Sequence, residues 1–101
     1  MSERDIYQPI IDYLTIQGCF VWRNSTGARG RYRFGKKGAP DIIGVTSKGR
    51  AIGVECKSKG KELSEDQKTF IEELRKRGAI VIIAYSLDDV IIKFEEVKNA
   101  L

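Results

Sequence analysis

The chain has 101 residues, of which 42% are hydrophobic and 32% charged, and its formal net charge is +4. We expect one globular domain over residues 1–101, since this length allows a single core and leaves no room for a second. The chain contains no histidine, which excludes acid–base or nucleophilic catalysis by imidazole and the usual zinc sites. An enzyme of this composition therefore works with carboxylates, lysine and a metal ion.

The composition also bears on location. No apolar run approaches the roughly 18 residues that suggest a membrane-spanning helix, and the N-terminal residues are charged, unlike those of a signal peptide. We expect no membrane partner and an intracellular, cytoplasmic location. In a reducing compartment Cys19 and Cys56 are predicted to be small buried hydrophobes rather than a disulfide.

The N-terminal part predicts a helix followed by a strand. Residues 2–16 place apolar side chains at helical spacing, with Ser2 as N-cap and acidic residues in the first turn. Pro9 within this stretch either kinks the helix or marks its true first turn. Gly18 ends the helix, and residues 19–23 predict a short strand.

Residues 24–39 form a glycine-punctuated segment that predicts a long loop. The stretch 23–37 holds six basic residues and no acid, so it carries more than the whole net charge. Aromatic residues alternate with the bases, a pattern that favours contact with phosphates and stacking on nucleobases or sugars. The alternative is a solvated basic loop. The candidate DNA-binding residues are Arg23, Arg29, Arg31, Tyr32, Arg33, Lys36 and Lys37.

Two apolar stretches, residues 41–45 and 51–57, predict the strands of a hairpin. Residues 47–49 between them suit a three-residue loop. The third position of such a loop adopts the left-handed conformation and favours glycine, and Gly49 is found there.

The hairpin would bring three charged side chains together. In the predicted register Asp41 lies directly opposite Glu55, and alternation places Lys57 on the same face as Glu55, with Cys56 on the other. Opposed like charges destabilise a sheet, whereas a hard cation such as Mg²⁺ is bound by carboxylate oxygens. The spacing therefore indicates a metal site, with Lys57 placed to orient or deprotonate a water, or to neutralise a phosphate. The alternative is an ordinary charged hairpin edge.

The C-terminal part predicts helix, strand and helix. Ser64 to Gln67 has the sequence of a capping box, and we expect this helix to run to about Arg77 and to end at Gly78. The nearly unbroken apolar run 79–85 is typical of a strand that is covered on both faces and hence central in its sheet.

A further start signal at residues 86–89 leads into a last helix that reaches residue 101. The predicted order is therefore helix–strand–strand–strand–helix–strand–helix. It belongs to the α/β class and predicts a small mixed β-sheet flanked by helices.

Taken together, these motifs resemble the PD-(D/E)xK nuclease superfamily, and within it the stand-alone form of the virus-type replication-repair nuclease (VRR-NUC) branch. The resemblance covers essentially the whole chain and depends on the order and spacing of its parts. It implies a restriction-endonuclease-like fold. The parts are Ser2-Glu3, Trp22-Arg23-Asn24-Ser25, Gly38-Ala39-Pro40-Asp41, Glu55-Cys56-Lys57 and Leu63-Ser64-Glu65-Asp66-Gln67.

The resemblance implies roles for the hairpin residues. Asp41 and Glu55 would be ligands of Mg²⁺ or Mn²⁺, and the main-chain carbonyl of Cys56 would complete the site. Lys57 would be the catalytic lysine.

Two further catalytic candidates lie outside the hairpin. Gln67 matches a glutamine that in this branch reaches the site from the following helix, and Glu3 matches an N-terminal acid that supports metal or water. Each also has a structural interpretation. Gln67 would serve only the capping box, and Glu3 would only balance the helix dipole.

From the resemblance we expect a metal-dependent endodeoxyribonuclease acting on branched DNA, with resolution of Holliday junctions by a homodimer as the leading hypothesis. A two-fold assembly suits two symmetric cuts. The alternatives are a repair nuclease acting on flaps, nicks or single strands, and a nucleic-acid-binding protein whose carboxylates are structural. The small stand-alone form implies a phage or mobile-element origin, and hence the cytoplasm of a phage or bacterial host.

Overall fold

The computed structural model describes residues 3–25, 27–29, 32–34 and 36–100. Its main sheet has four strands in the order β1-β4-β5-β6, antiparallel except for the parallel pair β5–β6. The predicted α/β class and the predicted order of helices and strands around this sheet are confirmed. The elements are α1 Glu3–Ile16, β1 Phe20–Arg23, β2 Gly27–Arg29, β3 Tyr32–Phe34, β4 Ile42–Val45, β5 Ala51–Cys56, α2 Glu65–Lys76, β6 Ile80–Ala84, α3 Leu87–Val97 and a 3₁₀ turn Lys98–Ala100.

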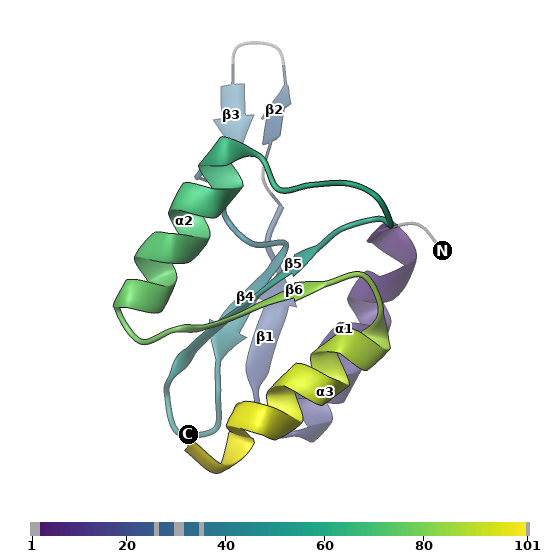
Figure 1. Ribbon diagram of the computed structural model, residues 1–101, viewed down its shortest axis with the longest axis vertical. Helices are drawn as coiled ribbons and strands as arrows, with labels where there is room; N and C mark the ends of the chain where they lie inside the picture. The colour runs from purple at the N-terminus through teal and green to yellow at the C-terminus, as the bar shows by residue number, and fades with distance from the viewer. Residues whose placement is uncertain (1–2, 26, 30–31, 35, 101) are drawn as a thin grey trace.

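Helices cover both faces of the sheet (Figure 1). Helices α1 and α3 lie on one side and α2 lies on the other. Because successive strand residues point to opposite faces, the paired residues Ile42, Val54 and Ile82 all face α1 and α3. The core on this face is made by Ile6, Ile10, Leu14, Cys19, Val21, Ile42, Ile52, Val54, Cys56, Ile80, Ile82, Ala84, Val90 and Phe94.

The hairpin β4–β5 has the predicted register. Ile42 pairs with Val54, and the Thr46 N–H donates to the Arg50 carbonyl at 2.8 Å, which leaves a three-residue loop. Gly49 closes that loop at φ +84°, in the left-handed region that glycine adopts without strain. Asp41, which precedes Ile42, therefore lies opposite Glu55, which follows Val54.

The segment that leads into β4 is held against β5. Pro40 is buried, and a Cβ added to Gly53 would lie 2.9 Å from the Pro40 ring, so only glycine leaves room for it. On the other side, the Asn24 side chain donates to the Pro40 carbonyl at 3.0 Å. The Asn24 main-chain N–H donates to the Asp41 carbonyl at 2.7 Å. These contacts fix where the chain enters β4.

The expectation that residues 79–85 form a central strand is wrong, because β6 is an edge strand of the sheet. Its residues are apolar because helices cover both of its faces, and not because a strand pairs with it on each side. Helix α2 is the crossover between parallel β5 and β6 and covers one face, and α3 covers the other. The Val81 carbonyl accepts a hydrogen bond from the Arg75 side chain at 2.7 Å.

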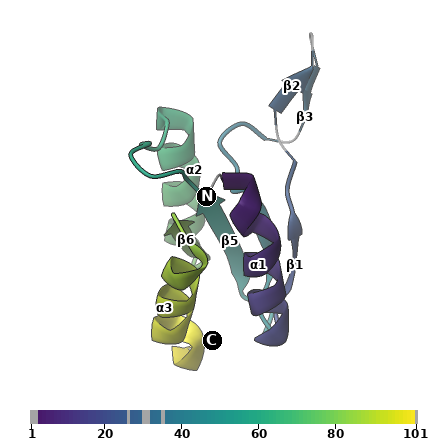
Figure 2. The same cartoon turned by 90° about the vertical axis from the view of Figure 1, so that its right-hand side faces the viewer.

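The expectation of an irregular loop over residues 24–39 is also wrong in part. Strands β2 and β3 pair antiparallel within it and form a separate two-stranded sheet. Figures 1 and 2 show this hairpin projecting from the body of the molecule at the end where α2 begins. Strands this short carry too few residues for alternation to distinguish them from a loop in the sequence.

The first helix begins at Glu3, so Pro9 lies inside it and does not mark its first turn. Ser2, predicted as N-cap, lies outside the described residues. The strand boundaries are one residue shorter than expected at the start of β1 and β4 and at the end of β5. No helix among the described residues is long and apolar enough to cross a membrane.

We predict that Gly53→Ala displaces the Pro40–Asp41 segment, because the added methyl would collide with the proline ring. Overpacking of this kind costs about 1–3 kcal/mol of unfolding free energy. It should also expose the Cys56 N–H, which donates to the Asp41 side chain at 2.8 Å. Urea unfolding and amide hydrogen exchange measure the two effects.

Gly49→Ala is the matched control. It introduces a left-handed alanine, which costs about 1–2 kcal/mol, but its Cβ would meet nothing within 4 Å. The control should therefore lose stability and keep the Cys56 amide protected. Equal protection of this amide in both variants would show that Gly53 does not position Pro40.

Candidate active site

Glu55 lies at the centre of the candidate site. Its side chain is only 2% exposed. The Oε1 atom accepts a hydrogen bond from Gln67 Nε2 at 2.6 Å, while Oε2 is buried and accepts none from the described residues. Burial raises the pKa of Glu55 to about 8, with a further contribution from the negative charge of Asp41.

Asp41 lies beside Glu55 as the register requires. Its Oδ2 accepts the main-chain N–H of Cys56 at 2.8 Å, which fixes the carboxylate against the end of β5. Burial raises the pKa of Asp41, although this hydrogen bond and the nearby Arg23 and Lys57 act in the opposite direction. The two carboxylates are therefore close, partly desolvated and mutually repulsive.

Cys56 is buried in the hydrophobic core on the opposite face of the sheet. Burial raises the pKa of its thiol to about 12, so the thiol stays protonated and does not offer a thiolate ligand. Cys56 therefore meets the site through its main-chain N–H, which donates to Asp41, and the role expected for its carbonyl stays a prediction.

Lys57 follows directly after β5, and its N–H donates to the Ala84 carbonyl at 2.9 Å, which extends the ladder to β6 by one residue. Its positive charge lowers the pKa of both Asp41 and Glu55, so the ammonium group lies near them. It makes no hydrogen bond or ion pair with another described side chain and remains available to a substrate.

Gln67 caps α2 and also contacts Glu55. Its side-chain Oε1 accepts the N–H of Ser64 at 2.9 Å, and its own N–H donates to Ser64 Oγ at 3.1 Å, which completes the capping box of α2. Its Nε2 donates to Glu55 at the same time. The capping interpretation is therefore confirmed, and the contact with Glu55 is compatible with the active-site interpretation, which stays a prediction.

Glu3 lies at the edge of the site. Its Oε2 accepts a hydrogen bond from Ser58 Oγ at 3.0 Å and lies 4.0 Å from the ammonium of Lys61. Its charge raises the pKa of Asp41 and Glu55. Glu3 thus acts on the site through its field, and it ties the start of α1 to the loop after β5.

Arg23 reaches the site from the end of β1. Its guanidinium lies 3.7 Å from the ring centre of Tyr7, a cation–π contact, and its charge lowers the pKa of Asp41. Tyr7 was not predicted to lie here. It stands one helical turn after Glu3, and the i, i+4 spacing from that acid was the one available signal.

The remaining candidate DNA-binding residues belong to the segment between β1 and β4. Lys36 and Lys37 are exposed. Lys37 pairs with Asp66 at 3.0 Å and Lys36 lies over the Phe70 ring at 5.9 Å. For Arg29, Tyr32 and Arg33 the structure describes main-chain pairing in the β2–β3 hairpin, and Arg31 lies outside the described residues.

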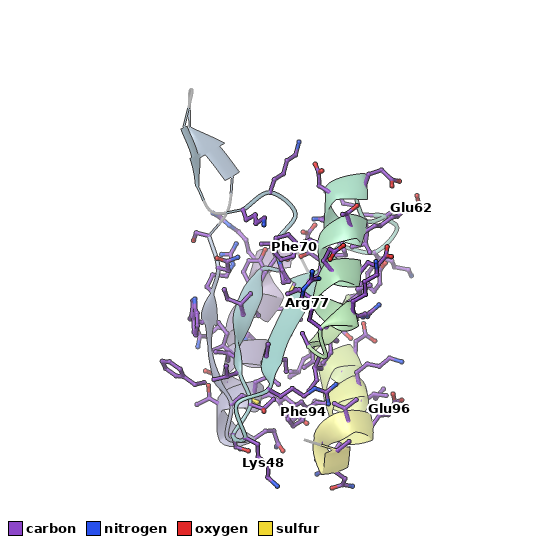
Figure 3. The ribbon with its side chains drawn as sticks, turned by 90° about the vertical axis from the view of Figure 1, so that its left-hand side faces the viewer. Lys48, Glu62, Phe70, Arg77, Phe94 and Glu96 are labelled. Carbon is purple, nitrogen blue, oxygen red and sulfur yellow. The ribbon has the colours of Figure 1, made fainter. Side chains whose placement is uncertain are left out.

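A cavity of about 640 Å³ lies between Lys36–Lys37 and α2. Asp41, Glu55, Lys57 and Gln67 do not line it, so this cavity does not contain the carboxylates. Phe70 contributes to it and also to a mainly apolar cavity of about 290 Å³ beneath α2. In Figure 3 the Phe70 side chain points from α2 towards the sheet.

The donor atoms of the site suit a hard divalent cation. Two adjacent carboxylates and an unpartnered buried oxygen, Glu55 Oε2, are unfavourable by themselves and are satisfied by such an ion. Among the described residues, no three His, Cys, Asp or Glu side chains come together to hold a metal. As the family resemblance implies, the ligands would be Asp41, Glu55 and the main-chain carbonyl of Cys56.

Comparisons with known proteins show which family and which solved structures the chain resembles. The model of the VRR-NUC domain matches residues 10–88. A solved structure described as a VRR_NUC domain is similar over 95% of this chain and 97% of its own, with 24% identity and a TM-score of 0.71. A second, described as a VRR_NUC domain protein, covers 97% of this chain and 89% of its own, with 20% identity and a TM-score of 0.67. A search of curated proteins found no match.

The raised pKa of Glu55 predicts that the metal-free protein loses stability as pH rises. The folded protein holds this proton up to about pH 8, whereas the unfolded chain releases it near the ordinary value of 4.5. The free energy of unfolding therefore falls across that window, by an amount on the order of a few kcal/mol. Asp41 acts in the same direction. Urea unfolding in EDTA at several pH values measures the decrease.

Glu55→Gln supplies the control, because glutamine carries no charge at any of these pH values. This variant should show a smaller decrease and be more stable than the wild-type protein above pH 8. A wild-type stability that stays level or rises across the window would contradict the desolvation of Glu55.

Proposed function

The chain belongs to the VRR-NUC domain family, a family of nucleases, and from that premise we propose that it is a Mg²⁺- or Mn²⁺-dependent endonuclease that cuts branched DNA. The observation that carries the proposal is the Asp41–Glu55 pair, with one Glu55 oxygen held by Gln67 and the other buried without a hydrogen-bond partner among the described residues. A protein that only binds DNA has no use for two repelling, desolvated acids next to basic residues.

The residues around the pair supply what phosphodiester hydrolysis needs. Asp41 and Glu55 would hold the cation with the Cys56 carbonyl. When bound, Mg²⁺ or Mn²⁺ lowers the pKa of water and offsets negative charge on the phosphate. Lys57, whose ammonium has no partner among the described side chains, would orient the attacking water beside the scissile phosphate. Gln67 keeps Glu55 in place.

Basic residues would bind the strand on either side of the cut. Arg23 lies near Asp41, braced by Tyr7, and Lys36 and Lys37 are exposed and line a cavity together with residues of α2. The β2–β3 hairpin between them projects from the body and carries Arg29 and Arg33. Such an array contacts the backbone and carries no base specificity.

We further propose that the enzyme acts as a homodimer on four-way junctions. The family resemblance supports this, and so does an exposed apolar surface on the sheet. Phe20 is 72% exposed, Trp22 46% and Val45 38%, and the rings of Phe20 and Trp22 contact each other. By the strand register these side chains share the face that α2 covers elsewhere. A flap- or nick-cutting enzyme with the same site is the second candidate.

We predict that cleavage of labelled junction DNA requires Mg²⁺ or Mn²⁺ and is abolished by EDTA. Glu55→Gln should lower the rate by more than about 100-fold, since even outer residues of metal sites contribute about 10- to 100-fold. The same variant should lose the rise in melting temperature that the divalent ion gives the wild-type protein. Gel assays and thermal unfolding measure these effects.

The substrates tested together should be a four-way junction, a flap, a nicked duplex and a single strand. Paired symmetric cuts in the junction, with a dimer in sedimentation, would support resolution. Preferred cutting of the flap by a monomer would favour the second candidate. Binding without cutting under every metal condition would refute the enzyme proposal.

We predict that the double variant Lys36→Ala/Lys37→Ala weakens DNA binding and lowers the slope of log K against log salt by about 2, one for each lost phosphate contact. The control is Lys93→Ala/Lys98→Ala, which removes the same charge from α3 and the 3₁₀ turn after it, where both lysines pair with glutamates of α3. Fluorescence anisotropy at several salt concentrations measures both slopes. Equal slopes for the two variants would exclude Lys36 and Lys37 from the DNA interface.

A further inference from the structure

One continuous series of hydrogen bonds links the start of α2 to the buried carboxylate. The Ser64 main-chain N–H donates to Gln67 Oε1 at 2.9 Å, and Gln67 Nε2 donates to Glu55 Oε1 at 2.6 Å. A second bond, from the Gln67 N–H to Ser64 Oγ at 3.1 Å, caps the helix but does not involve the carboxamide. The two bonds made by Ser64 therefore have different consequences.

The carboxamide of Gln67 is useful to Glu55 in one orientation only. Its NH₂ group donates hydrogen bonds and its oxygen accepts them. If the group were turned over, its oxygen would face the Glu55 carboxylate and its NH₂ group would face the Ser64 N–H. Both contacts would then be repulsive, whereas in the observed orientation both are hydrogen bonds.

We infer that Ser64 is a positioning residue of the active site, and that it acts through its main-chain N–H by fixing the Gln67 carboxamide with its NH₂ group towards Glu55. The inference builds on the proposed function. It has a consequence for Glu55. Because Gln67 occupies Oε1, the unpartnered Oε2 is the oxygen left free for a cation.

The main-chain conformation of Ser64 allows its two bonds to be separated. Its φ is −70°, which lies within the range that proline imposes, about −65 ± 15°. Ser64→Ala removes the Oγ cap and keeps the N–H. Ser64→Pro removes both. The difference between these two variants therefore reports the N–H bond to Gln67.

Both variants should lose the helix cap and melt about 4–8 °C lower than the wild-type protein. Below its melting temperature, Ser64→Ala should cleave DNA with kcat within about twofold of wild type. Ser64→Pro should lose about tenfold or more in kcat, the effect of one hydrogen bond to a charged group, with KM for DNA unchanged. Equal kcat in the two variants would overturn the inference.

Exchange of the Gln67 side-chain NH₂ protons with water gives a readout that needs no catalysis. In ¹⁵N-labelled protein this exchange should be slow in wild type and in Ser64→Ala, and fast in Ser64→Pro. Slow exchange in Ser64→Pro would overturn the inference even if the wild-type protein cuts DNA. Failure of the wild-type protein to cut DNA would refute the proposed function and leave the exchange result standing.

If Ser64→Pro does not fold, the same N–H can be removed by an ester in place of the Leu63–Ser64 peptide bond. This change keeps the serine side chain. Cys56 gives a native ligation junction for joining a synthetic C-terminal segment that carries the ester. Fast exchange of the Gln67 NH₂ protons in the refolded ester protein, compared with the all-amide chain, is the expected result. Equal exchange rates would overturn the inference.

Discussion

The burial of the Glu55 carboxylate beside Asp41 is the constraint around which the molecule is organised. A carboxylate that is 2% exposed and next to another acid disfavours its charged form. The protein offsets this with the hydrogen bond from Gln67, the nearby charge of Lys57 and the main-chain N–H of Asp41. One oxygen is left unsatisfied. A fold selected for stability alone would replace this group, so its presence is best explained by the chemistry proposed for it.

The first turn of α2 joins the two halves of the site. On one side, Gln67 bonds Glu55 at the end of β5. On the other, Lys37 pairs with Asp66, and a Cβ added to Gly38 would lie 2.4 Å from the Asp66 carbonyl, so the chain leading to Pro40 and Asp41 packs directly on this turn. The segment that carries Asp41 and the side chain of Glu55 thus both contact the first turn of α2. This explains how two repelling acids keep a fixed separation.

The basic residues around the Asp41–Glu55 pair differ in how firmly their side chains are packed against the rest of the protein. Arg23 is braced on the Tyr7 ring and lies close enough to Asp41 to affect its pKa. Lys36 and Lys37 are exposed beside the Phe70 side of α2. The β2–β3 hairpin stands away from the body. Residues near the carboxylates are therefore placed by packing, and those farther out contribute mainly charge.

The sequence by itself determined the parts of this structure that depend on neighbouring residues. The three-residue loop ending in Gly49 sets the register of β4 and β5, and period-two alternation then brings Asp41 level with Glu55 and places Cys56 on the other face. The capping box at Ser64 and the end of α2 at Gly78 are local in the same sense.

Only the tertiary structure decided what depends on how these elements pack together. It brought Gln67 to Glu55, placed Tyr7 beneath Arg23, and put β6 at the edge of the sheet with a helix on each face. An apolar strand has the same sequence whether helices or strands cover it. A glutamine that caps a helix has the same sequence whether or not its free NH₂ group meets a carboxylate. These contacts join residues far apart in the chain, and no local pattern of spacing encodes them.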